Sequence, residues 1–148
     1  MIGAIGSDQE PIVLGDLRIG KAWSTMKVPL AIAPLGEEQP PKVTDTMTAA
    51  ITESDNAAAE KIWASLGDPD TAAHKVEAVL RQAGDPTRVE SKKVRPEFTA
   101  FGQSDWALAN QVRFISYAAC QGSDEPIFNL MGQVEPDQRW GLGTIAKT

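Results

Sequence analysis

The sequence has very few of the residues that form metal sites and disulfide bonds. It contains a single cysteine, Cys120, and a single histidine, His74. A single cysteine cannot form a disulfide within the chain. One cysteine and one histidine are also too few for a structural zinc site, which needs several such ligands. We therefore expect neither a metal nor any other cofactor.

Positive charge and long apolar runs are also scarce. The 14 lysines and arginines are outnumbered by 20 aspartates and glutamates, and they form no basic stripe, which argues against a nucleic-acid partner. The longest apolar stretch, around residues 28–35, is far shorter than the roughly 20 residues of a membrane span. The first residues lack a basic segment followed by an apolar one. The sequence thus predicts a soluble chain with no membrane span and no export signal.

The chain has enough hydrophobic residues to form one core. It contains 148 residues, of which 42% are hydrophobic, and we therefore expect a single domain covering 1–148. Residues 2–7 and 11–14 are short apolar runs on either side of Asp8 and Gln9, which predicts an N-terminal hairpin of two strands.

Most of the remaining sequence has the periodicity and end signals of helices. A polar, irregular stretch at 85–103 predicts a long surface loop, and 143–148 predicts the start of a strand. The fold class expected is α+β and mainly helical. The predicted helices cover 24–35, 42–52, 56–66, 70 or 71 to 83, 104–120 and 126–133.

Ser24-Thr25-Met26-Lys27 is an S-x-x-K tetrad at the expected start of a helix, which Ser24 can cap. Residues three apart share a helix face, so the amine of Lys27 can approach the hydroxyl of Ser24 as a base beside a nucleophile. A helix N-terminus also favours developing negative charge. Alone the tetrad is a weak signal, because shuffling this composition gives about 0.4 matches per chain.

Ser54-Asp55-Asn56 adds a much more specific signal. The same shuffling gives this triplet only about 0.01 times per chain. It can serve simply as the N-cap of the next helix, but a loop between two helices can also direct Ser54 and Asn56 towards Ser24.

With these two motifs the chain resembles the serine β-lactamase and penicillin-binding protein superfamily, whose signatures are S-x-x-K, S-x-N and a late K-T-G. The third would be Lys147-Thr148. Within the superfamily, residues 22–30 and 51–60 look like a family of uncharacterised exported serine hydrolases of actinobacteria. The resemblance runs along nearly the whole chain and implies an extracytoplasmic protein.

The resemblance also implies a reaction and a role for each matching residue. Ser24 would be acylated by a β-lactam or by a peptidoglycan-type acyl-D-Ala-D-Ala peptide, with Lys27 as the base or as a group that tunes one. Ser54 would relay a proton to the leaving nitrogen, and Asn56 would position Lys27 and the substrate amide. Lys147 and Thr148 would hold the substrate carboxylate.

Three departures from the family pattern shape these expectations. The sequence stops at Thr148, before the glycine of the third motif and the strands that follow it, and the usual N-terminal helix does not precede the hairpin. We thus expect an incomplete fold of this type. The E-x-x-L-N segment that deacylates class A β-lactamases is absent, and Glu90 and Glu97 in the long loop are best interpreted as solvated charges.

The alternative to an enzyme is a catalytically incompetent truncated remnant or a binding-only domain.

Other conspicuous residues have simpler interpretations. His74 is expected on a helix face, since no G-x-S-x-G nucleophile motif accompanies it. Residues 141–146 match a loose G-x-G-x-x-A pattern but leave no room for the helix that dinucleotide binding requires. Cys120 is expected to be buried, and the four tryptophans are expected in or near the core, although Trp23 can instead line a cleft beside Ser24.

Overall fold

The structure, a computed structural model, describes residues 1–7, 9–37 and 41–140. The fold is α+β, with about 51% helix and a two-stranded antiparallel sheet, so the predicted class and its large helical share are confirmed. The strands are β1 (Ile19–Lys21) and β2 (Asp105–Ala107). The helices are η1 (Trp23–Met26), α1 (Lys27–Leu35), α2 (Asp45–Thr52), α3 (Asn56–Ser65), α4 (Pro69–Gln82), η2 (Phe101–Gln103), α5 (Leu108–Ala118), α6 (Glu125–Met131) and η3 (Pro136–Gln138), where η marks a 3-10 turn.

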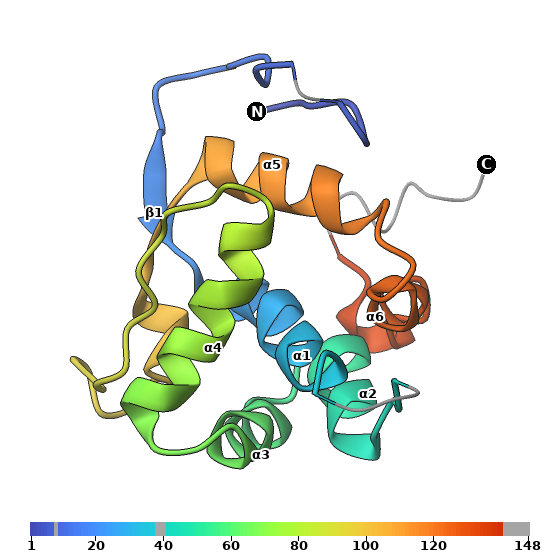
Figure 1. Ribbon diagram of the computed structural model, residues 1–148. Helices are drawn as coiled ribbons and strands as arrows, with labels where there is room; N and C mark the ends of the chain where they lie inside the picture. Colours follow the sequence, from blue (N-terminus) through green and yellow to red (C-terminus); the bar gives the residue numbers. More distant parts are fainter. Residues whose placement is uncertain (8, 38–40, 141–148) are drawn as a thin grey trace.

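Helix α1 forms the centre of the core. It packs against α2, α3 and α4, and Figure 1 shows it surrounded by these helices with α5 and α6 beyond. Its sequence is almost entirely apolar, and Leu30 and Ala31 are fully buried. Pro29 is tolerated because it lies in the first turn, where its missing N–H has no partner within the helix. The buried helix α1 therefore fixes the position of the residues just before it.

Side-chain caps determine where the other helices begin. Thr44 accepts a hydrogen bond from the Met47 amide, so α2 starts at Asp45 rather than at the expected residue 42. Asp68 accepts from two amides and starts α4 at Pro69, slightly before the expected Asp70 or Thr71. Gly84, which follows this helix, has φ +70°, the left-handed conformation that often ends a helix.

In the residues described, the predicted N-terminal hairpin forms only in part, because its two segments pair antiparallel at one position and form no strands. Residues 2–7 and 11–14 meet only in an isolated bridge between Ile2 and Ile12. The sheet instead joins two distant segments, with Ile19 opposite Ala107 and Lys21 opposite Asp105. Three-residue strands carry no periodicity that the sequence could reveal.

Strand β2 replaces the expected first turn of the helix predicted at 104–120. Its middle residue, Trp106, is only 1% exposed, and the indole Nε1–H donates to Asp85 at 2.6 Å. An extended backbone lets Trp106 point inward while Asp105 stays at the surface. Helix α5 therefore begins only at Leu108, and Ser104 instead uses its hydroxyl to bind the Phe101 carbonyl.

Residues 85–100 form the predicted long loop, and α4 fixes its first part. Glu77, a buried residue of α4, accepts hydrogen bonds from the Val89 amide and from Arg81 and Arg88. The Gln103 side chain holds the far end through the Arg95 and Thr99 backbone. The loop is thus attached to the core at both ends.

The four tryptophans have different environments. Trp63 and Trp106 are buried as expected, Trp140 is 78% exposed and differs from expectation, and Trp23 is 44% exposed and lines the pocket beside Ser24, which was the alternative. The strand predicted at 143–148 lies outside the described residues. Among the residues that are described, no helix is long and apolar enough to cross a membrane.

Candidate functional site

Ser24 lies in a 3-10 turn that runs directly into α1. It does not cap the helix as expected, because η1 has no side-chain cap and Ser24 is inside the turn. The preceding residue, Trp23, has φ +48°, a conformation that bulky residues rarely adopt. The hydroxyl of Ser24 is thereby exposed at the surface and available for other partners.

Lys27, the first residue of α1, lies beneath this turn and is 2% exposed. Its Nζ donates to the backbone oxygen of Ser54 and to the Ser54 hydroxyl, the latter at 3.1 Å. A buried ammonium or amine needs such partners, because burial without them is costly. Lys27 therefore joins the S-x-x-K turn to the loop between α2 and α3.

Ser54 completes a continuous hydrogen-bond chain. Its Oγ lies 3.0 Å from Ser24 Oγ and 3.1 Å from Lys27 Nζ, so it bridges the two. Ser54 has φ +54°, and the next residue, Asp55, caps α3 by accepting from the Ala58 amide. The tight loop between the helices thus points the Ser54 side chain towards Ser24.

The charge state of Lys27 is shifted towards the neutral amine. Burial lowers the pKa of the Lys27 side chain below its ordinary value, and the nearby Asp55 carboxylate opposes part of this shift. A lowered pKa increases the fraction of amine that can accept a proton near neutral pH. The site therefore combines a serine hydroxyl with a lysine whose pKa is lowered by burial.

These groups open into a small pocket of about 210 Å³. The predicted residues Ser24, Lys27 and Asn56 line it. Phe98 and Thr99 line it as well, although no sequence motif marked either residue. Their only signal was their place in a long loop, a kind of segment that is often functional.

The two glutamates of the long loop, interpreted from the sequence as solvated charges, do not line this pocket. Glu97 pairs with Arg95 at the surface, and Glu90 accepts from the Lys92 amide, so neither lines the pocket. Lys147 and Thr148, predicted to bind the substrate carboxylate, lie outside the described residues. His74 is exposed on α4, as its interpretation as a helix-face residue requires.

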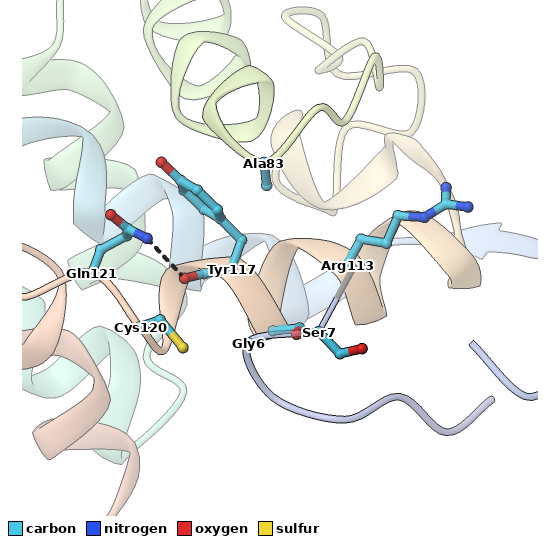
Figure 2. A pocket seen from close by; sticks show the side chains of 8 residues that line it. Gly6, Ser7, Ala83, Arg113, Tyr117, Cys120 and Gln121 are labelled. Carbon is cyan, nitrogen blue, oxygen red and sulfur yellow. Dashed lines mark hydrogen bonds between the residues drawn. The ribbon is translucent and has the colours of Figure 1, made fainter. Parts of the chain in front are cut away.

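A larger hollow of about 470 Å³ lies elsewhere, between the N-terminal segment and α5 (Figure 2). Tyr117 and Arg113 project from α5 near Ala83 at the end of α4, with Gly6 on the opposite side. Cys120 lies here and is exposed, so its predicted burial is wrong: it follows the end of α5 and faces solvent instead of the core. We assign the site to the smaller pocket because Ser24 and Lys27, which line it, are linked by hydrogen bonds through Ser54.

Comparisons of the sequence and structure with protein-family models, curated proteins and solved structures give no match. In the part of the chain that the structure describes, no group of three or more histidine, cysteine, aspartate or glutamate side chains is placed to hold a metal ion.

Proposed function

We propose that this chain carries the nucleophile of an active-site-serine acyl-transfer hydrolase of the β-lactamase and penicillin-binding type. Its substrates would be β-lactams or D-alanyl peptides, and its fold an incomplete version of that architecture. The observation that carries the proposal is the hydrogen-bond chain from Lys27 through Ser54 to Ser24. The substrate class comes from the resemblance of the two motifs to that superfamily.

The direction of the chain depends on the charge of Lys27. When Lys27 is an ammonium it donates to Ser54, which donates to Ser24, and the nucleophile keeps its proton. When Lys27 is a neutral amine its lone pair accepts from Ser54, which can then accept from Ser24. The lowered pKa of Lys27 favours this second arrangement.

Acylation then follows from the positions of these groups. Ser24 Oγ attacks the carbonyl carbon of the substrate amide, and its proton passes through Ser54 Oγ to Lys27 Nζ. The tetrahedral intermediate collapses to a Ser24 ester as the carbon–nitrogen bond breaks, and Ser54 returns the proton to the leaving nitrogen. Ser24 lies in the first helical turn, whose amides and dipole stabilise the developing oxyanion.

Asn56, Lys147 and Thr148 are assigned to substrate positioning. Asn56 begins α3 and lines the pocket beside Ser24, a position suited to binding the substrate amide. For Lys147 and Thr148, the role of binding the substrate carboxylate comes only from the resemblance. Because peptidoglycan-type substrates lie outside the cytoplasm, we also propose an extracytoplasmic location.

Covalent labelling tests this function. Incubation with a fluorescent penicillin, followed by intact-mass measurement, is expected to add one ligand mass to the wild-type chain. Ser24→Ala should remove the label, whereas the control Ser65→Ala, which changes an exposed serine at the end of α3, should not. Absence of a label on the wild type, or equal labelling of Ser24→Ala, would contradict the assignment of the nucleophile.

A binding-only domain is the second candidate, and one observation favours it. Lys27 donates to the Ser54 carbonyl, and the Asp55 carboxylate is nearby, both of which favour the ammonium form that cannot accept a proton. In that case penicillin would bind reversibly, with a chemical shift change at pocket residues but no gain in mass. The same sample thus distinguishes the two candidates.

A further inference from the structure

Two aromatic side chains lie beside the nucleophile and have no part in the proposed proton transfer. Trp23 immediately precedes Ser24, and Phe98 comes from the long loop. Their ring centroids are 5.0 Å apart with an interplanar angle of 62°, an edge-to-face arrangement. Both line the same pocket as Ser24 and Lys27, so an acyl group attached to Ser24 would lie against them.

The backbone holds this aromatic pair in place. Trp23 has φ +48°, and such a strained conformation persists only where its surroundings determine it. A Cβ on Gly102 would lie 2.7 Å from Thr99 Oγ1 and 3.4 Å from the Trp23 carbonyl oxygen. A larger residue at position 102 would therefore force the Thr99 side chain to move, so Gly102 allows this close packing against the turn that carries Ser24.

The charges around the pair are already compensated. The Arg95 guanidinium lies over the Phe98 ring, 4.4 Å from its centroid, and also binds Glu97 at 3.0 Å. Lys27 is buried and donates to Ser54. The aromatic side of the pocket thus presents ring surface, with its neighbouring cations paired to groups of this chain.

We propose that Trp23 and Phe98 are specificity-determining residues that bind an aromatic ring on the acyl group of the substrate. This inference rests on the proposed function, since it concerns the acyl group that Ser24 would carry. The pocket of about 210 Å³ can take one ring, because an apolar cavity of about 150 Å³ is sufficient to bind benzene. A ring bound there gains aromatic contacts with both residues.

Binding of an unreactive probe tests the aromatic pair without any chemistry. In ¹H–¹⁵N spectra, N-methylphenylacetamide should shift the Trp23 indole signal, and N-methylacetamide should not. Phe98→Ala should weaken binding of the aromatic amide about tenfold, since it removes one ring contact and the burial that goes with it. The control Val94→Ala changes an exposed residue of the same loop and should have no effect. Equal binding by Phe98→Ala and the wild type would overturn the proposal.

Acylation rates give a second readout that separates this inference from the proposed function. The wild type should react faster with p-nitrophenyl phenylacetate than with p-nitrophenyl acetate, relative to their rates of spontaneous hydrolysis. Phe98→Ala should reduce this preference about tenfold, whereas the control Val94→Ala should leave both rates and the preference unchanged. If acetyl and phenylacetyl transfer are equal in both proteins, the aromatic pair does not determine specificity. If neither ester acylates Ser24, the proposed function fails, and the amide-binding experiment still decides whether the pair binds aromatic rings.

Discussion

Ser54 and Ser24, which are 30 residues apart in the chain, place their hydroxyl oxygens 3.0 Å from each other. The contact requires two uncommon backbone conformations, because Ser54 and the neighbour of Ser24, Trp23, both have positive φ. Backbone strain of this kind costs on the order of 1–3 kcal/mol per residue and is concentrated at functional sites. The strained residues thus lie where the proposed proton relay is formed.

Replacing Ser54 should separate its chemical role from its conformational cost. Both Ser54→Ala and Ser54→Gly remove the bridging hydroxyl, and we expect acylation by a fluorescent penicillin to slow by about 10²- to 10⁴-fold in each. Their stabilities should differ, because glycine accepts φ +54° without a Cβ clash and alanine does not.

Urea unfolding measures the second part of this prediction. Ser54→Gly should be more stable than Ser54→Ala by about 1 kcal/mol. Equal acylation by the wild type and both variants would show that the hydroxyl of Ser54 does not relay the proton.

The pH dependence of acylation should report on Lys27. Since burial lowers its pKa and only the neutral amine accepts a proton, the rate should rise as pH increases through this lowered pKa and then level off. Asp55→Asn keeps a side-chain oxygen able to cap α3 but removes the carboxylate that raises the pKa of Lys27. The midpoint of the rate profile should therefore move to lower pH. A shift to higher pH would show that Lys27 is not the group that titrates.

Glu77 should control the attachment of the long loop. Burial alone would raise its pKa, but hydrogen bonds from the Val89 amide and Arg88, with the charges of Arg88 and Arg81, lower it overall. A carboxylate with a lowered pKa stabilises the fold above its unfolded-state pKa, and the contribution is lost as pH falls through the folded-state value. Glu77→Ala should lower the free energy of unfolding by about 2–4 kcal/mol at neutral pH.

The same variant should expose the loop to trypsin at Lys92 and Lys93, which are exposed in the loop that Glu77 anchors. The matched control is Glu10→Ala, which breaks the exposed ion pair with Arg113 and should cost no more than about 1 kcal/mol. If the two variants have the same stability and the same cleavage rate, Glu77 does not anchor the loop.

Asp85 and Trp106 form a buried hydrogen bond that should contribute as much to stability as the contacts of Glu77 do. Asp85→Ala leaves the Trp106 indole N–H and the Thr87 amide without this acceptor, and we expect a loss of about 2–4 kcal/mol in thermal or urea unfolding. Asp105→Ala, one residue from Trp106, breaks only an exposed pair with Lys21 and should change stability by less than about 1 kcal/mol. Comparable losses in the two variants would contradict this assignment.

Local sequence signals were sufficient to predict most helices and the residues that meet at the site. The caps Asp55 and Asp68 and the apolar periodicity determine α3 and α4, and both elements form close to their expected limits. Helical spacing placed Lys27 near Ser24, and the structure brings Ser54 to both. These relationships depend on neighbouring residues or on one short loop.

Features that depend on long-range contacts were not predictable in this way. Strands β1 and β2 are extended because they pair with each other and because Trp106 is buried. Phe98 reaches the pocket only because the loop packs against Trp23, a contact that no sequence spacing reveals. The exposure of Cys120 likewise depends on where α5 ends relative to the core.

The pairing of β1 with β2 has a consequence for the order in which the site forms during folding. The contacts among α1, α2 and α3, which bring Ser24, Lys27 and Ser54 together, connect nearby parts of the chain. The β1–β2 pair connects distant parts, and closing so long a loop is slow because it costs more chain entropy. Phe98 lies within that long loop, so we expect the contacts among Ser24, Lys27 and Ser54 to form before Phe98 packs beside them.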